Sequence, residues 1–321
     1  MVVLALLLAA LLVAGCGGDD SSDEEAPPPA RAQDFPKPAG KRLDQLAAGL
    51  GSGPVLAPSG AEFRTGKQRF GFALFKPDRS QITDASVAVY VAPRDGGPVQ
   101  GPYLAKYESL AVKPQFQSRQ TASDPDAAKS IYTTEIPFDK AGAYDLIGIA
   151  KQGNKLVVAT PASAGIVVKD AANDPIPAVG TAPPRIHTPT KASAGGDIAS
   201  IDTRLPPSSM HDVDFASVLG KKPVVLVFAT PQLCQSRVCG PVVDIAEQVK
   251  AKTENADVDF IHMEVFNDNR IDAGIRPQMD AFHLQTEPWV FTFDRSGKVA
   301  DRIEGAFSER ELEQAIEKAK S

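Results

Sequence analysis

One stretch of the sequence, residues 222–250, constrains the fold more than any other. Val224–Phe228 is an unbroken apolar and largely β-branched run of strand length, typical of a strand that is covered on both faces in an α/β sheet. Thr230 and Pro231 end this run. Apolar residues then recur at helical spacing, namely Val242, Val243, Ile245, Ala246 and Val249. The stretch therefore predicts a buried strand that turns directly into a helix.

Two cysteines, Cys234 and Cys239, lie in the turn between this strand and this helix. The first turn of a helix offers unpaired backbone N–H groups and a partial positive charge, which favour a thiolate over a thiol. On one regular helix the two Cα atoms would be roughly 8.7 Å apart, which exceeds the roughly 7 Å that a disulfide can span. Because Pro241 is tolerated only in a first turn, we expect the helix to begin near Cys239 and Cys234 to lie in the preceding loop.

The segments around the cysteines carry a family resemblance. LGKKPVVLVFAT before them and TEPWVFTFDRSGKVADRIEGAFSERELEQAI after them resemble the thioredoxin superfamily, in particular its membrane-anchored, extracytoplasmic redoxin branch of the TlpA type. The resemblance covers about the last 145 residues. It implies that residues 206–321 form a thioredoxin-like α/β domain in which Cys234 and Cys239 are the catalytic dithiol.

The resemblance also implies a substrate-binding loop. In that family an X-Pro bond in the cis form faces the dithiol, and Glu287-Pro288 occupies the matching position. Propensity alone gives only a small prior for a cis bond. We therefore expect Glu287, Pro288 and Trp289 to bind substrate beside the two sulfur atoms.

Two departures from the thioredoxin pattern leave an alternative open. Thioredoxins carry C-x-x-C preceded by Trp, whereas this chain carries C-x4-C preceded by Leu233. The C-x4-C spacing matches the bacterioferritin-comigratory type of peroxiredoxin, in which the first cysteine attacks peroxide and the second resolves it. That family has Thr three residues before the first cysteine, and this chain has Pro231 there.

The rest of this half predicts further thioredoxin-like elements. The pattern indicates a strand over 257–265, a short helix over 279–284, a hairpin over 291–299 and a helix over 309–320 capped by Ser308. His211, Asp212 and Asp214 precede a short helix over 215–219, and capping accounts for them better than metal binding.

The N-terminal residues resemble a lipoprotein signal. Residues 2–14 form an apolar run that is too short for an ordinary membrane span and long enough for a signal-peptide core. Val13–Cys16 resembles the bacterial lipobox, which implies a signal peptide over residues 1–15 and lipidation of Cys16. Residues 16–45 are acidic and then Pro/Ala-rich, and we expect a disordered stalk there.

A first folded domain is predicted between the stalk and the thioredoxin-like domain. Residues 46–170 contain short alternating runs separated by turn residues, which favours an all-β sandwich. The clearest runs are 68–75, 86–91, 130–136, 144–149, 157–158 and 165–169. Residues 132–144 resemble the closing strands of bacterial immunoglobulin-like domains. The Pro-rich residues 171–205 form the connection, and such a connection predicts that the two domains melt separately.

Composition limits the function classes. The net charge of −6 without a basic cluster gives no support for nucleic-acid binding, and no phosphate-binding loop, G-x-S-x-G elbow or H-E-x-x-H motif occurs. We expect no metal and no cofactor. In an exported protein disulfides persist, so with Cys16 lipidated only Cys234 and Cys239 are left to pair.

These features together predict a membrane-anchored extracytoplasmic thiol–disulfide oxidoreductase that acts on protein thiols or disulfides outside the cytoplasm. A thiol peroxidase and a non-enzymatic binding module with a structural disulfide stay open as alternatives. We favour Cys234 as the nucleophile because the loop position is the more accessible one. Glu287 either accepts a proton from the resolving Cys239 or points to solvent, and Arg237 either supports the thiolate or is an exposed solubilising residue.

Overall fold

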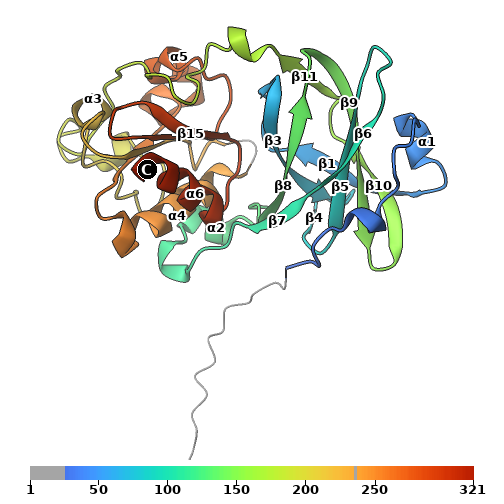
Figure 1. The fold of residues 1–321 in the computed structure, drawn as a ribbon. Helices are drawn as coiled ribbons and strands as arrows, with labels where there is room; N and C mark the ends of the chain where they lie inside the picture. The colour runs from blue at the N-terminus through green and yellow to red at the C-terminus, as the bar shows by residue number, and fades with distance from the viewer. Residues whose placement is uncertain (1–25, 235–236) are drawn as a thin grey trace, which may run out of the picture.

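The computed structural model describes residues 26–234 and 237–321, so the predicted signal peptide and Cys16 lie outside the described residues. Two β-sheets lie side by side, a large mixed sheet from the first half of the chain and a small sheet from the second half (Figure 1). The helices of the second half of the chain pack against the small sheet. Among the described residues, no helix is both long and apolar enough to cross a membrane.

The small sheet contains four strands in the order β13-β12-β14-β15. Their bounds are β12 Val224–Phe228, β13 Asp259–Met263, β14 Trp289–Phe293 and β15 Val299–Glu304. β12 and β13 are parallel, whereas β14 and β15 run antiparallel to their neighbours. Along the chain, a helix follows β12 and β14 and β15 form a hairpin, as the sequence predicts.

Every residue of β12 is buried, as the unbroken apolar run predicts. Val225 and Val227 pack with α4 (Cys239–Lys250) and α6 (Glu309–Lys320) on one face of the sheet. Leu226 and Phe228 pack among aromatic side chains on the other face. The strand is therefore covered on both sides, which fixes the position of the loop at its carboxyl end.

The helices of this half begin and end close to the predicted residues. α4 begins at Cys239, and Ser308 caps α6 by accepting a hydrogen bond from the Glu311 N–H. Asp214 caps α3 (Phe215–Val218), which confirms capping as the role of that aspartate. α5 covers Pro277–Ala281, two residues earlier than predicted at its start. Short 3-10 turns η5, η6 and η7 cover Thr253–Asn255, Asn267–Asn269 and Ile271–Ala273.

The large sheet confirms all six predicted strand runs and adds five strands. Its strands are β1 Gly51–Pro58, β2 Phe63–Arg64, β3 Gly66–Phe75, β4 Gln81–Ile82, β5 Ser86–Pro93, β6 Gln100–Leu104, β7 Lys106–Ser109, β8 Ser130–Phe138, β9 Gly142–Gln152, β10 Lys155–Pro161 and β11 Ile166–Lys169. The main path runs β2-β11-β9-β10-β1-β3-β8-β7, with β4 on β3 and with β5 joining β9 to β6. β1–β10 and β2–β11 are parallel, and the other pairs are antiparallel. The immunoglobulin-like assignment stays a prediction.

The predicted stalk ends earlier than residue 45. η1 (Ala32–Asp34) and α1 (Leu43–Ala47) pack on the large sheet, and the side chains of Phe35 and Leu46 are buried there. The Tyr90 hydroxyl donates a hydrogen bond of 2.7 Å to the Pro36 carbonyl. The prediction of disorder was wrong for this part because its few apolar residues find a partner surface that composition does not reveal.

The two halves share a continuous apolar cluster. Residues 110–128, which include η2 (Pro114–Phe116) and α2 (Arg119–Ser123), leave the large sheet and pack on α4 (Figure 1). Leu110 and Ala128 belong to the same cluster as Cys239. The predicted connection, 171–205, with η3 (Ala171–Asn173) and η4 (Ile198–Ser200), also buries Ile176, Ile186 and Ile201. The sheets are therefore held together by more than the connection.

Candidate redox site

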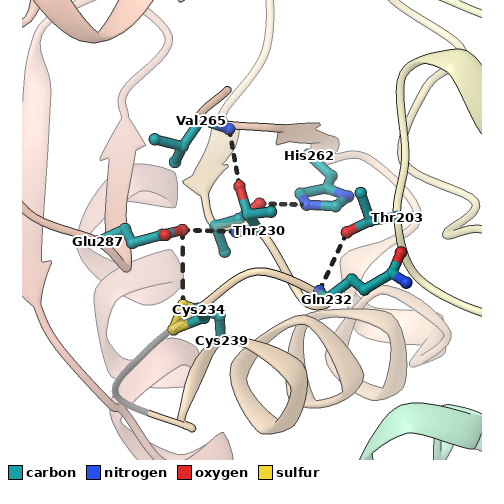
Figure 2. Close-up of a disulfide and its surroundings, with 9 residues drawn as sticks. Thr203, Thr230, Gln232, Cys234, Cys239, His262, Val265 and Glu287 are labelled. Carbon is teal, nitrogen blue, oxygen red and sulfur yellow. Dashed lines mark hydrogen bonds between the residues drawn. A yellow bond between two sulfur atoms is a disulfide. The ribbon is translucent and has the colours of Figure 1, made fainter. Parts of the chain in front are cut away.

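Cys234 and Cys239 form a disulfide, with their Cα atoms 6.0 Å apart (Figure 2). Cys234 lies in the loop after β12 and is partly exposed, whereas Cys239 is the first residue of α4 and is fully buried. The predicted placement is confirmed, with one cysteine in the loop and the other at the helix start. Cys234 is therefore the more accessible of the two cysteines.

A carboxyl group faces the buried sulfur. Glu287 Oε2 lies 3.6 Å from Cys239 Sγ and accepts a hydrogen bond of 2.7 Å from the backbone N–H of Thr230 (Figure 2). Burial raises the pKa of Glu287 to about 7, and the hydrogen bond from Thr230 opposes this rise. The sequence left open whether Glu287 faces the sulfur atoms or solvent, and the structure places its carboxyl at the sulfur atoms. Near neutral pH this group can both donate and accept a proton.

The peptide bond between Glu287 and Pro288 is cis, as the resemblance predicts. Pro288 is buried, and its carbonyl accepts a hydrogen bond of 2.8 Å from the Gly305 N–H. The loop thus leads into β14, and its Glu287 side chain points at the disulfide. Its role in binding substrate stays a prediction.

The side chain of Trp289, unlike that of Glu287, does not lie at the disulfide. Trp289 is buried in the aromatic cluster on the face of the sheet opposite to α4, where its ring stacks on Phe291 at 5.7 Å. Its indole N–H donates to Thr286 Oγ1 at 2.9 Å. The expectation that the Trp289 side chain binds substrate is therefore corrected, because strand alternation directs it away from the sulfur atoms.

Arg237 does not face the sulfur atoms through its charged group. Its guanidinium forms an ion pair with Asp126, and its carbonyl accepts a hydrogen bond of 3.3 Å from the Ala128 N–H. Both contacts join the loop to the segment that comes from the large sheet. The guanidinium therefore holds this segment rather than supporting a thiolate.

A buried group of ionisable side chains lies next to the carboxyl end of β12. His262 on β13 donates from Nε2 to the Ala229 carbonyl at 2.9 Å, and its Nδ1 lies 3.4 Å from Asp202 Oδ2 (Figure 2 shows the first contact). Glu264 Oε1 lies 3.9 Å from His262 Nε2 and accepts the Thr203 N–H at 2.7 Å. His211 Nε2 lies 2.9 Å from the same oxygen of Asp202.

The charges in this group are strongly coupled. Burial opposes protonation of the imidazole, yet the charge of Asp202 raises the pKa of His262 to about 9. Burial likewise opposes ionisation of Asp202, but the charge of His262 and the surrounding hydrogen bonds hold the pKa of Asp202 well below its usual range. His262 is therefore a buried cation paired with a buried anion at neutral pH.

Two sets of described side chains have the composition of a metal site. One set is Asp202, His211 and His262, and the other is Cys234, Cys239 and Glu287. In the first set, Asp202 Oδ2 already accepts the Ser208 N–H at 2.6 Å besides its contacts with both histidines. In the second set, the two sulfur atoms are bonded to each other. Hydrogen bonds and the disulfide therefore account for both sets.

The comparisons with known proteins give distant structural matches only. No protein-family model matches the sequence, and no curated protein matches it. Among solved structures, MTB dsbF in its mixed oxidized and reduced forms matches with 21% identity over 35% of this chain and 92% of that chain, at a TM-score of 0.25. A thioredoxin-family thiol:disulfide interchange protein from Chlorobium tepidum TLS matches with 17% identity over 44% of this chain and 97% of that chain, at a TM-score of 0.31. The chain is thus similar, over part of its length, to thioredoxin-family thiol:disulfide interchange proteins.

Proposed function

We propose that the protein is a thiol–disulfide oxidoreductase whose redox centre is the Cys234–Cys239 disulfide. One observation carries the proposal. A partly exposed sulfur is bonded to a buried sulfur at the start of α4, and the carboxyl of Glu287 lies 3.6 Å from the buried one. Such a site offers one atom to attack, one to leave and a proton for the leaving atom.

The exchange begins at Cys234. A partner thiolate attacks Cys234 Sγ, so that a mixed disulfide forms between the partner and Cys234 while the bond to Cys239 breaks. Cys239 leaves as a thiolate and takes the proton of the Glu287 carboxyl. A second thiolate of the partner then attacks the partner sulfur of the mixed disulfide and releases the Cys234 thiolate. The partner dithiol is oxidised by two electrons and the protein disulfide is reduced by two.

The reverse direction uses the same groups. The Cys234 thiolate attacks a partner disulfide, and the Glu287 carboxylate takes the proton of Cys239. The Cys239 thiolate then attacks Cys234 Sγ in the mixed disulfide, and the reduced partner leaves. Because burial keeps the pKa of Glu287 near 7, the carboxyl can serve both directions near neutral pH.

The place of action is proposed to be outside the cytoplasm, on a membrane reached through lipid on Cys16. The support is the apolar run of residues 2–14 followed by Val13–Cys16. Membrane fractionation with lipid labelling tests this part. The Cys16→Ser protein is expected to stay unprocessed or to be released, and a Cys16→Ser protein that is still processed and acylated would contradict the anchor.

No observation favours a thiol peroxidase. Pro231 occupies the position where the peroxiredoxin pattern has Thr, and the hydroxyl of the neighbouring Thr230 accepts a hydrogen bond of 3.0 Å from the Val265 N–H. Trapping of a mixed disulfide distinguishes the oxidoreductase from a non-enzymatic binding module with a structural disulfide.

Trapping of the mixed disulfide tests the proposal. With oxidised glutathione as the probe, the Cys239→Ser protein is expected to accumulate an adduct on Cys234, which intact-mass analysis detects. The Cys234→Ser protein should stay unmodified while folded, because Cys239 is buried, and should react once it is unfolded in denaturant. The reverse pattern would exchange the roles of the two cysteines. Absence of an adduct on either folded variant would favour a structural disulfide.

A further inference from the structure

The buried ionisable group of Asp202, His262 and Glu264 has no part in the exchange steps given above. Asp202 and His262 are fully enclosed, and Glu264 Oε2 is buried without a hydrogen-bond partner among the described residues. Charged groups are costly to bury unless they are paired. Because the group lies beside the redox loop, we examine which hydrogen bonds link it to the residues around the sulfur atoms.

One peptide group connects His262 with Glu287. The peptide between Ala229 and Thr230 receives the His262 Nε2–H on its carbonyl at 2.9 Å and gives its own N–H to Glu287 Oε2 at 2.7 Å (Figure 2). A hydrogen bond to the carbonyl of a peptide polarises that peptide and strengthens the bond that its N–H donates. A charged imidazole on one side therefore favours a carboxylate on the other.

We propose that His262 is a positioning residue that controls the protonation of Glu287 through the Ala229–Thr230 peptide. The inference rests on the proposed function, because protonation of Glu287 decides whether Cys239 receives or loses a proton. His262 itself touches neither sulfur nor substrate. Its effect on exchange is carried entirely by Glu287.

The groups around His262 keep it charged while Glu287 titrates. Asp202 faces it from the connection, His211 from the segment between the connection and α3, and Glu264 directly follows β13. Burial raises the pKa of Glu264, and the charge of Asp202 raises the pKa of His262 to about 9 against the effect of burial. The charge of Asp202 balances that of His262, so the group carries no net positive charge, but the protonated Nε2 of His262 remains the donor to the Ala229 carbonyl.

The groups that face Glu287 come from three elements. They are the disulfide at the start of α4, the Thr230 N–H after β12, and the charges of His262 on β13 and of Glu264 directly after it. Arg276, before α5, acts on Glu264. Of these groups, His262 is the one that favours the carboxylate by charge, and Glu264 opposes it. Removal of His262 should therefore shift the titration of Glu287 to higher pH.

The decisive measurement is an NMR titration of the full chain in its oxidised form, without any thiol partner. The ring nitrogen signals of His262 should show an inflection near pH 7 that follows the ionisation of Glu287, since coupling between two sites is reciprocal. Glu287→Gln should abolish that inflection. The ring signals of His187, which is bonded to Asp214, provide the internal control and should show no such dependence on Glu287.

A second arm measures the carboxyl directly. In His262→Gln the side-chain ¹³C signal of Glu287 should titrate about one pH unit higher than in the parent, the low end of the effect of a nearby opposite charge. His187→Gln, the same substitution at an exposed site, should leave the signal unchanged. If His262→Gln does not fold, the Glu287→Gln arm decides. A His262 ring that is insensitive to Glu287 overturns the inference. If the His262 ring is insensitive to Glu287 but the mixed disulfide is trapped, the coupling is wrong and the oxidoreductase proposal stands. If the coupling is seen but no mixed disulfide is trapped, the coupling stands and the oxidoreductase proposal is wrong.

Discussion

In the proposed exchange Glu287 determines how protons reach Cys239, because its carboxyl is the acidic group placed beside that sulfur among the described residues. The same burial has a cost for the folded state. In the unfolded chain the carboxyl ionises near pH 4.5, whereas in the folded chain it ionises near pH 7. Between these values the folded state holds a proton that the unfolded state has lost, so stability falls as the pH rises through this window.

The first prediction concerns this window. The parent should lose stability relative to Glu287→Gln as the pH rises from 4.5 to 8, by at most about 3 kcal/mol, since each pKa unit corresponds to about 1.4 kcal/mol. Urea unfolding of both proteins at pH 5 and pH 8 measures the difference. Glu135→Gln, at an exposed position on β8, is the matched control and should show no comparable change. A pH-independent difference between parent and Glu287→Gln would show that the pKa of the Glu287 carboxyl is not raised in the folded state.

At the scale of elements, α4 is held from the side of the large sheet. Asp244 on this helix is fully buried and receives the Ser118 N–H at 3.0 Å and Arg204 Nε at 2.8 Å. Arg204 also donates to the carbonyls of Phe116 and Pro206. Residues from three separate parts of the chain therefore meet at Asp244 and fix the helix that carries Cys239.

The second prediction is that Asp244→Ala destabilises the protein by roughly 3–5 kcal/mol, because it leaves the buried charge of Arg204 without its partner. Glu135→Ala, which breaks the exposed pair with Lys67, should cost less than about 1 kcal/mol. Denaturant midpoints of the two variants give the comparison. If both substitutions lowered the free energy of unfolding by the same small amount, the contacts of Asp244 would not hold α4 in place.

At the scale of the whole molecule, two ion pairs join the large sheet to the first turn of α6. Arg69 on β3 donates two hydrogen bonds to Glu311 on α6, at 2.7 and 3.0 Å. Glu108 on β7 pairs with Arg310 and accepts the Ser308 hydroxyl at 2.7 Å. Together with the shared apolar cluster, these contacts argue against the separate melting that the Pro-rich connection predicted.

The third prediction is therefore a single unfolding transition. The one tryptophan, Trp289, reports on the small sheet, whereas all five tyrosines lie in the part of the chain that forms the large sheet. Trp fluorescence and tyrosine near-UV circular dichroism should give coincident denaturant midpoints. Two midpoints that differ between the probes would restore the view of two independent domains.

The sequence predicted the features that depend on local patterns and missed those that depend on contacts between residues far apart in the chain. The strand Val224–Phe228, the helix start at Cys239 and the cis bond before Pro288 follow from runs, spacing and a resemblance. β1 and β6 were missed because Gly and Pro interrupt their alternation. The pairing of Asp202 with His262 joins residues 60 positions apart, so no spacing rule could reveal it.

The most direct test of the central claim, that Cys234–Cys239 is a redox centre, is its reduction potential. Equilibration of the full chain with dithiothreitol and glutathione buffers, followed by alkylation of the free thiols, measures this potential. We predict a value above about −300 mV and reversible exchange with glutathione, because Cys234 is accessible and Glu287 supplies the proton for Cys239. A potential below about −300 mV together with resistance to small thiols would contradict the account and identify a structural disulfide.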